Sequence, residues 1–278
     1  MTIDRLMEEA RKFLEGPMNF VAAEEALRPD IAGMRIYDEP LFGAASADDP
    51  LFLELRRPEV VHPGEMTPRD WVPDAKSVVS FFLPFSDRVV SSNAEGTQTS
   101  EEWLHGRIEG QLAMAAFGER LKKFLEDEGF AAAYPTTDAR FKMLEPYASN
   151  WSERHIAYIC GLGTFGLSKG LITERGMAGR FGSIVTNAEI EPTPRKYSDP
   201  FEYCTLCGAC QFRCPAKAID KSRGPALAKD QKLCDAWVTS TKRPPHGPNA
   251  RVRFGCGKCQ VRVPCSRRIP KRCEKVKK

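Results

Sequence analysis

The chain lacks any hydrophobic segment long enough to carry it across a membrane. Its 278 residues contain no apolar run near the roughly 20 residues of a membrane-spanning helix, and the longest candidate, Val78 to Phe85, fits a buried strand instead. The N-terminus, Met1 to Arg5, also lacks the basic and then apolar stretches of a secretory signal. These two absences predict a cytoplasmic protein.

Cysteine is almost absent from the first 200 residues, where Cys160 stands alone. The other nine of the ten cysteines follow residue 200 at the short spacings of metal ligands. Ten cysteines in a secreted chain would indicate disulfides, but this chain carries no secretory signal. The pattern therefore favours iron–sulfur ligation in a reducing compartment.

Acidic residues are scarce toward the C-terminal end. Residues 216–278 hold 18 Lys and Arg against 4 Asp and Glu, whereas residues 1–215 hold 23 against 33. A basic segment of this kind binds nucleic acid or an acidic electron donor, or it offsets the negative charge of bound clusters. Charge alone leaves these roles open.

Apolar periodicity predicts a chain with both helices and strands. A long helix is expected from about Ser100 to Glu128, with a capping box at Thr99 and Glu102 and with Gly129 after its end. The other expected elements are helices over 2–15 and 150–160 and strands over 77–85, 130–134 and 183–190.

The expected linkers are rich in proline. Residues 30–75 have little periodicity, which predicts a loop-rich segment that forms either a pocket wall or plain surface. Residues 191–203 combine proline with charge and mark the expected domain boundary. We therefore expect one domain over residues 1–195 and a second over residues 196–278.

The strongest chemical signal is the run Cys204-x-x-Cys207-x-x-Cys210-x-x-x-Cys214-Pro215. This is the spacing of bacterial ferredoxins, in which three cysteines hold one cubane and the fourth holds the other. A zinc site would more often present two separated Cys-x-x-Cys pairs. The run therefore predicts two 4Fe-4S clusters.

Further cysteines complete the two expected ligand sets. Cys273 is left over and competes with Cys265 for one position, and Cys160 reads as a small buried apolar residue. The first predicted set is Cys204, Cys207, Cys210 and Cys265, and the second is Cys214, Cys234, Cys256 and Cys259.

Four further motifs accompany the ferredoxin run, namely Ser152-Glu153-Arg154-His155, Gly161-Leu-Gly-Thr-Phe-Gly166, Gly182-Ser183 and Cys256-Gly-Lys-Cys259-Gln260. The Gly-x-Gly-x-x-Gly stretch among them would by itself suggest a dinucleotide site, but a helix and not a strand is expected before it. Together with the ferredoxin run, these motifs resemble those of the epoxyqueuosine reductase family, which is related to the reductive dehalogenases. The resemblance covers roughly residues 75–270.

The resemblance implies an α+β fold, in which a nitroreductase-like cobalamin-binding domain precedes a bacterial ferredoxin-like domain with two 4Fe-4S clusters. A flavin in place of cobalamin is the less favoured variant. The implied electron donor is a low-potential protein such as a ferredoxin or a flavodoxin. The residues that it implies at the corrinoid are Gly161, Gly163, Gly166, Gly182 and Ser183.

Two departures from the family bear on function. Where epoxyqueuosine reductases place a general-acid Asp, six residues before Glu153, this chain has Tyr147. Reductive dehalogenases use a tyrosine as proton donor, so Tyr147 is a candidate acid or else a packing aromatic, and Asp138 is the alternative acid. The family also continues into a helical repeat region that helps to hold tRNA, whereas this chain ends at Lys278, so specific tRNA binding is not expected.

Three functions follow from the sequence. The first is a cobalamin-dependent reductase of an unidentified small molecule, with electrons entering through the clusters. The second is an electron-transfer protein that reduces a corrinoid protein or another partner. The third is a tRNA epoxyqueuosine reductase. His105 and His155 are further candidate proton donors, although a lone helical histidine is more often structural.

Overall fold

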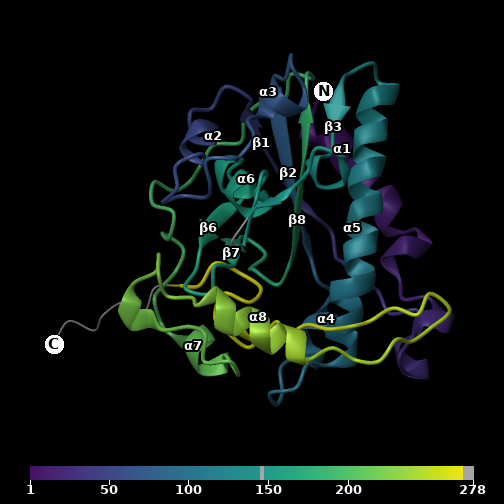
Figure 1. Cartoon of the computed structure of the whole chain (residues 1–278). Helices are drawn as coiled ribbons and strands as arrows, with labels where there is room; N and C mark the ends of the chain where they lie inside the picture. The colour runs from purple at the N-terminus through teal and green to yellow at the C-terminus, as the bar shows by residue number, and fades with distance from the viewer. Residues whose placement is uncertain (145–146, 272–278) are drawn as a thin grey trace.

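The computed structural model of the protein describes residues 1–144 and 147–271, and its centre is a four-stranded sheet (Figure 1). All neighbouring strands are antiparallel, in the order β1-β2-β8-β3. The central pair, β2 and β8, runs side by side from Ser77 opposite Thr186 to Pro84 opposite Gly179. The strands are β1 (Leu41–Ser46), β2 (Ser77–Pro84), β3 (Ala132–Ala133) and β8 (Gly179–Thr186).

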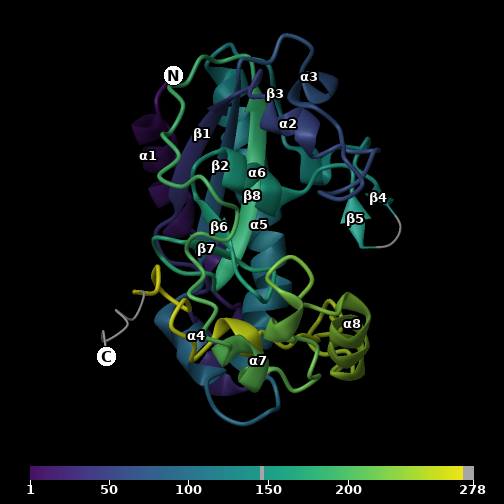
Figure 2. The same cartoon turned by 90° about the vertical axis from the view of Figure 1, so that its left-hand side faces the viewer.

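Helices cover both faces of this sheet. The long α5 (Glu101–Asp127) and α1 (Ile3–Leu14) pack on one face, and α6 (Glu153–Ile159) lies on the other (Figure 2). Successive residues of β2 accordingly enter different clusters, with Val79 joining the α1 and α5 side and Val78 the α6 side. This explains why every residue of β2 is buried, since apolar side chains are needed on both faces.

Shorter elements surround these layers. The structure contains no helix, among the residues it describes, that is long and apolar enough to span a bilayer. The short helices are α2 (Leu51–Glu54), α3 (Pro68–Trp71), α4 (Asp87–Ser92), α7 (Ala209–Arg213) and α8 (Gln231–Ser240). The 3₁₀ turns are Pro17–Asn19, Ala23–Glu25, Pro29–Ile31, Pro135–Thr137, Lys221–Arg223 and Lys258–Gln260. Two hairpins are made by β4 (Met143–Leu144) with β5 (Ala148–Ser149) and by β6 (Gly163–Phe165) with β7 (Leu171–Thr173).

The sequence predicts the mixed α/β content and the long helix correctly but misplaces several ends. The N-cap of α5 is Ser100, whose hydroxyl accepts the Trp103 N–H at 3.2 Å, and not Thr99. The expected helix over 150–160 is the shorter α6, and the strand expected at 183–190 is β8, which begins and ends about four residues earlier. Local patterns locate these elements, while tertiary contacts set where they stop.

Strand β1 is the strand of the central sheet that the sequence misses, inside the stretch 30–75 expected to be irregular. Its residues are Leu-Phe-Gly-Ala-Ala-Ser, which lack the β-branched side chains typical of strands. Small residues are required here, because a Cβ on Gly43 would lie 2.2 Å from the Cys160 carbonyl oxygen. Close packing against the segment that follows α6 therefore outweighs intrinsic strand preference.

The cysteine-rich segment is held against the start of α5. A Cβ on Gly257 would lie 2.0 Å from the Trp103 ring, so the backbone of this loop rests directly on the indole. The Asn93 side chain, just after α4, donates to the Cys256 carbonyl at 2.8 Å. Together these contacts fix a loop that carries predicted cluster ligands to one end of the sheet.

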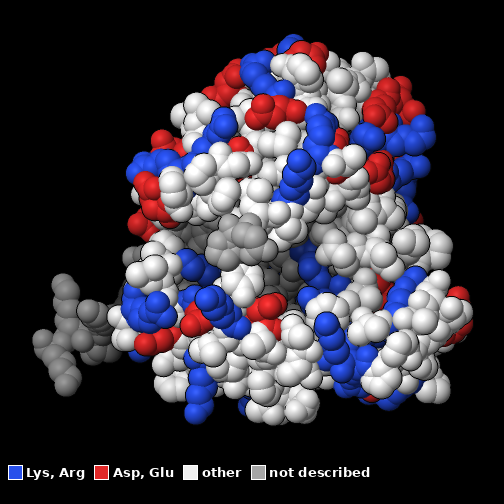
Figure 3. Space-filling view, in the orientation of Figure 1, with Lys and Arg blue, Asp and Glu red and all other residues white. Residues whose placement is uncertain are grey.

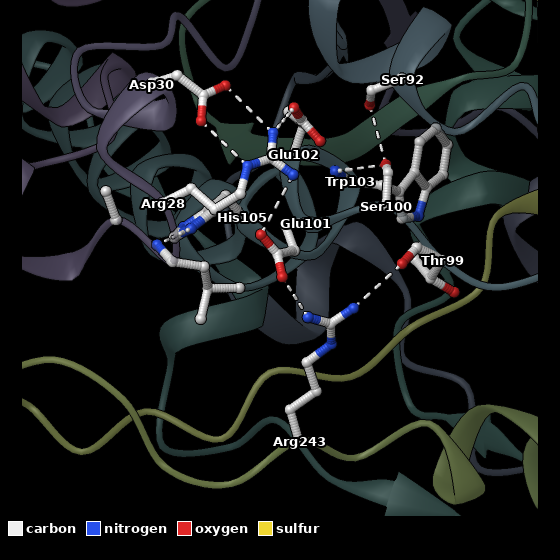
Figure 4. Close-up of polar contacts among 12 residues, drawn as sticks. Arg28, Asp30, Ser92, Thr99, Ser100, Glu101, Glu102, Trp103, His105 and Arg243 are labelled. Carbon is white, nitrogen blue, oxygen red and sulfur yellow. Dashed lines mark hydrogen bonds and ion pairs between the residues drawn. The ribbon is translucent and has the colours of Figure 1, made fainter.

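Ion pairs at the first turn of α5 join two distant parts of the chain (Figure 4). Arg28 contacts Glu102 at 2.7 Å and Asp30 at 3.0 Å, and Arg243 contacts Glu101 at 2.6 Å. Acidic side chains at this position also interact favourably with the positive end of the helix dipole. The N-terminal segment and the segment around residue 243 thus meet on one helix end.

A buried charge network lies one turn further along α5. Arg253, 1% exposed, contacts Glu25 at 2.7 Å and Glu109 at 2.6 Å. The His105 Nε2 accepts the Leu27 N–H, so its Nδ1 carries the hydrogen and donates to Glu109 at 2.9 Å. Burial raises the pKa of Glu109, but the hydrogen bonds from His105 and Arg253 outweigh it and hold that pKa below its usual range. His105 is therefore structural and lies away from the cavity described below.

Replacing Arg253 by Met should destabilise the protein by about 3 kcal/mol at neutral pH, because two buried carboxylates lose their main partner. Arg251, 3.5 Å from both carboxylates, would compensate only in part. The free energy of unfolding, measured in urea, provides the test. Because the pKa of Glu109 is lowered, this stabilisation exists above the unfolded pKa and is lost as the pH falls, so the penalty should shrink in acid.

The matched control is Arg69→Met, which breaks the exposed pair with Asp48 at 2.8 Å. Such pairs contribute about 0 to 1 kcal/mol. Equal losses for the two variants would contradict the role assigned to the buried network.

Candidate functional site

The largest cavity, about 680 Å³, lies between α6, the β4–β5 hairpin and one end of β8. Figure 3 shows a hollow across the middle of the molecule, between the part that holds the sheet and the part that holds α7 and α8. Apolar residues form part of its wall, namely Val60, Val61, Phe141, Met143, Trp151, Met177 and Phe181. Polar residues form the remainder, among them Gln111, Ser149, Ser152, Glu153, Arg154, His155, Arg180 and Gln260.

Glu153, the first residue of α6, holds a proton near neutral pH on this wall. The Thr136 hydroxyl donates to one of its carboxyl oxygens at 2.8 Å, and the Ser183 hydroxyl donates to the other at 2.7 Å. Burial raises the pKa of Glu153 to about 7, although both hydroxyls act against it. A carboxyl group with this pKa can both give and regain a proton at physiological pH.

A second buried carboxyl, Glu65, lies behind the same wall. It accepts the Ser152 N–H at 2.7 Å, and its other oxygen has no hydrogen-bond partner among the described residues. Burial, with a smaller contribution from the nearby Glu153, raises the pKa of Glu65 to about 8, although the hydrogen bond from Ser152 acts against it. Neither carboxyl has a cationic partner in the described chain, so burial favours the protonated, neutral form of both.

The basic side chains of the wall lack carboxylate partners. Arg154 donates to the Lys169 carbonyl at 2.6 Å and Arg180 to the Arg107 carbonyl at 2.8 Å, and neither forms an ion pair with a described residue. Burial, followed by the charges of Arg154 and Lys169, lowers the pKa of His155 to about 3, so its imidazole stays neutral. The cavity therefore offers two cations to an anionic group.

The two candidate acids from the sequence lie in different surroundings. Tyr147 is on the cavity wall, 51% exposed, at the β4–β5 hairpin. Asp138 is not among the wall residues and contacts Arg140 at 2.6 Å. The hydrogen bond from Arg140 lowers the pKa of Asp138 to about 2, so it carries no proton near neutral pH. Of the two, Tyr147 lines the described cavity and Asp138 does not.

The residues expected at a corrinoid are not on this wall. A Cβ on Gly163 would lie 2.0 Å from the Ile172 carbonyl oxygen, and one on Gly182 would lie 2.4 Å from the Phe81 ring, so both positions serve close packing. Ser183 lies one layer behind the wall, where it binds Glu153. The five residues absent from the described lining are Gly161, Gly163, Gly166, Gly182 and Ser183.

The eight cysteines lie in two groups of four, the same groups that the sequence predicts. One group lines a cavity of about 280 Å³ and the other a small one of about 20 Å³. Cys160 is outside both groups, fully buried, with its thiol directed at the Val78 carbonyl at 3.4 Å. Cys273 lies outside the described residues. The first group is Cys214, Cys234, Cys256 and Cys259, and the second is Cys204, Cys207, Cys210 and Cys265.

The donor chemistry of both groups suits iron–sulfur clusters. Four cysteine side chains line each cavity, and soft sulfur ligands are those that such clusters require. The cavity of the Cys214 group also has Asp235 and Lys229 on its wall. Within the described chain, no three His, Cys, Asp or Glu side chains converge on a single-ion position. Ligands of a cubane stand further apart than those of one ion, because each binds a different corner.

The cluster cavities adjoin the large cavity. Gly179, Arg180 and Gln260 line both the large cavity and that of the Cys214 group, and Met177 lines both the large cavity and that of the Cys204 group. One end of β8 therefore separates a predicted electron carrier from the space where a substrate or cofactor would bind.

Sequence reasoning assigned no role to Glu65, Glu153, Arg154 or Arg180. Glu153 and Arg154 stand in a motif at a helix start, which places polar side chains at a helix end but does not show that they face a cavity. Arg180 and Glu65 lie far from that motif in the chain. Only the fold brings them to the same wall.

Replacing Cys265 by Ser should remove about four of the roughly eight irons per chain in anaerobically prepared protein, because each cubane takes four cysteine ligands. Cys160→Ala, which changes the cysteine outside both groups, should keep the full iron content. Iron analysis with visible absorption provides the measurement. Stoichiometric zinc with little iron in the unmodified protein would contradict both clusters, and loss of iron from Cys273→Ser but not Cys265→Ser would reassign the ligand.

Glu153→Gln should make stability less dependent on pH. Since burial raises the pKa of Glu153 from 4.5 to about 7, the native protein keeps a proton that the unfolded chain loses, and its stability falls as the pH rises through that window. A glutamine does not titrate. Relative to the unmodified protein, the variant should therefore gain about 1 to 3 kcal/mol between pH values of roughly 5 and 8. If the free energies of unfolding of the variant and of the unmodified protein changed equally with pH across this range, the raised pKa of Glu153 would be contradicted.

No protein-family model matches the chain, and no curated protein matches it in sequence. Solved structures do match. An epoxyqueuosine reductase with an epoxyqueuosine-modified stem loop of tyrosine tRNA gives a TM-score of 0.55 at 18% identity, over 95% of this chain and 65% of its own. A catabolic reductive dehalogenase gives 0.55 at 13% identity, over 95% of this chain and 37% of its own.

A further reductive dehalogenase, whose structure suggests a mechanism for B12-dependent dehalogenation, gives a TM-score of 0.50 at 14% identity, over 79% of this chain and 28% of its own. This chain thus spans 65% of the epoxyqueuosine reductase and a smaller share of the dehalogenases. Identities this low establish the fold. The protein has the fold shared by epoxyqueuosine reductases and reductive dehalogenases.

Proposed function

We propose that the protein is a cobalamin-dependent reductase of a small molecule, with electrons entering through two 4Fe-4S clusters. The observation that carries the proposal is the position of the two cysteine groups, whose cavities share wall residues with the large cavity. The reductase fold and the B12-dependent chemistry of one structural neighbour support it. The proposal includes a nitroreductase-like domain over residues 1–195 and a ferredoxin-like domain over residues 196–278.

The large cavity suits a corrinoid. Such a macrocycle is wide and flat, with apolar faces and a fringe of amides, and the wall combines apolar residues with hydrogen-bonding ones such as Gln111, Ser149 and Gln260. Cobalamin, when bound, supplies a strongly reducing and nucleophilic cobalt centre. A flavin is the alternative cofactor for the same space. The reducing conditions that low-potential clusters need support a cytoplasmic location.

The residues of the chain supply protons and orientation. Reduction of an epoxide to an alkene and water consumes two electrons and two protons, and reductive removal of a halide consumes two electrons and one proton. Two candidate proton donors, Tyr147 and Glu153, lie on the wall. Glu153 can donate its proton and leave a carboxylate that the Ser183 and Thr136 hydroxyls stabilise. Arg154 and Arg180 would orient an anionic group of the substrate.

A second candidate function is reduction of epoxyqueuosine in tRNA. The structural likeness to a reductase bound to an epoxyqueuosine-modified stem loop favours it. The chain spans 65% of that reductase, so the activity of the whole relative is a proposal here. Transfer of electrons to a partner, without a substrate of its own, is the outcome to be expected if no cofactor occupies the large cavity.

Anaerobic reconstitution with hydroxocobalamin tests the proposal. The protein should retain cobalt as well as iron after gel filtration, with the corrinoid absorption spectrum altered by burial. The same experiment with flavin mononucleotide is the control. Retention of flavin but not of the corrinoid would identify a flavin as the cofactor. Retention of iron alone would favour the electron-transfer function.

Tyr147→Phe should keep iron and corrinoid but slow reduction by about 10²- to 10⁴-fold, the usual effect of removing an acid catalyst. The probes are 3-bromo-4-hydroxybenzoic acid and an epoxyqueuosine-modified stem loop, each with dithionite as reductant. Asp138→Asn is the matched control and should keep its rate, because Asp138 carries no proton near neutral pH. Full activity of Tyr147→Phe together with loss in Asp138→Asn would reverse the assignment.

A further inference from the structure

Large apolar side chains stand exposed beside one predicted cluster. Phe212 on α7 is 82% exposed and Leu206 is 48% exposed, and both flank Cys207 in sequence. Of the eight predicted ligands, Cys207 is the exposed one, while the other seven are buried or half-buried. The surface beside the predicted cluster of the Cys204 group is thus apolar and open to solvent. We call Leu206, Cys207, Phe212, Lys217 and Lys221 the Phe212 patch.

Backbone geometry holds this patch together. The chain turns at Gly208, which has φ of 80° and caps the start of α7, and the Phe212 N–H bonds to its carbonyl at 3.2 Å. Leu206 itself has φ of 52°, an uncommon value for a side chain with a Cβ. Lys221 folds back over the turn, with its Cδ 3.0 Å from where a Gly208 Cβ would stand.

The rim of the patch is positively charged. Lys217, Lys221 and Arg223 are all exposed, and none forms an ion pair with any residue in the described part of the chain. The acidic residue among them, Asp220, uses its carboxylate to cap the Ser222 N–H at 2.9 Å. Most other surface arginines of the chain, such as Arg57 and Arg69, lie against carboxylates. This rim is therefore free to attract acidic groups.

An apolar centre with a basic rim suits a protein partner with the opposite charge. Exposed apolar patches rimmed by charge mark interaction surfaces, and charge complementarity speeds encounter. Nucleic acid would use the basic rim but leave an exposed phenylalanine and leucine without a role. A partner bound at this surface would also lie next to Cys207, a predicted cluster ligand, and is therefore expected to exchange electrons with the cluster.

We propose that the Phe212 patch is the docking surface for an acidic, low-potential electron-transfer protein, a flavin or iron–sulfur carrier, that reduces the cluster of the Cys204 group. The inference rests on the proposed function in that it requires this cluster. Each transfer moves one electron from the reduced partner to the cluster, so the partner is oxidised by one electron and no bond or proton moves. The Cys214 group shares three wall residues with the large cavity, Gly179, Arg180 and Gln260, whereas the Cys204 group shares Met177.

Stopped-flow reduction of the cluster-loaded protein by an acidic flavodoxin hydroquinone tests the surface. Phe212→Ser should slow bleaching of the cluster absorption by about 10- to 100-fold, the effect of removing a central interface anchor. The double variant Lys217→Glu and Lys221→Glu should slow it at low salt and remove its decrease with ionic strength. Leu53→Ser and Arg56→Glu, at the distant α2 (Figure 1), are the matched controls and should have no effect.

Reduction by dithionite separates this inference from the proposed function. Both Phe212 patch variants should bleach with dithionite at the normal rate and contain the normal iron, which shows that their clusters are intact. Unchanged flavodoxin rates in Phe212→Ser, or no reduction of the unmodified protein by flavodoxin while dithionite bleaches it, would overturn the docking surface but leave the clusters in place. The unmodified protein is also tested for binding of tRNA and of anionic vesicles. If Phe212→Ser abolished such binding and left the flavodoxin rates unchanged, the patch would be assigned to that other partner. Absence of iron would defeat both proposals.

Discussion

The structure depends on the contact between the cysteine-rich segment and α5. The small apolar core of that segment, formed by Cys210, Ile219, Ala228 and Val263, is completed by Leu167 from the loop between β6 and β7. Burial of so few side chains cannot position two cluster sites against a sheet. The position comes instead from charges removed from water, chiefly Arg253 between Glu25 and Glu109, and from the loop that rests on Trp103. A charged pair of this kind tolerates little displacement, because each partner is costly to bury alone.

The end of β8 at Gly179 and Arg180 lies between the predicted cluster sites and the large cavity, and so brings them together as one candidate site. Arg180 lines both the cavity of the Cys214 group and the large cavity, and the absence of a side chain at Gly179 lets the same strand pack closely on Leu83. Glu153 of α6, with a pKa of about 7, lies on the wall of the large cavity. Cations, a proton-bearing carboxyl and the predicted electron carriers therefore surround one space, although they come from segments far apart in the chain.

The sequence was informative where chemistry depends on local spacing. Cys204, Cys207, Cys210 and Cys214 follow a spacing that predicts cluster sites, and the later cysteines line the same two cavities as these four. The sequence was uninformative where tertiary packing decides the local structure or the pKa of a side chain. Gly43 makes β1 a strand through a neighbour that no local pattern reveals, and Glu65 acquires its raised pKa from burial behind α6. Gly163 and Gly182, two of the glycines expected around a cofactor, leave no room for a Cβ against their neighbours, and a motif cannot distinguish this need from ligand contact.

The pairing of Glu25 with Arg253 also dictates an order of assembly. These residues are 228 positions apart, and joining them closes nearly the whole chain into a loop, whose entropy must be lost before the contact forms. Contacts of such long range form late in folding. On the ribosome, Glu25 remains a hydrated carboxylate until the segment around Arg253 has emerged, whereas Cys204, Cys207 and Cys210 emerge together. Both cysteine groups are therefore completed only after the residues of α5 have left the ribosome, because Cys259 and Cys265 follow them in the chain.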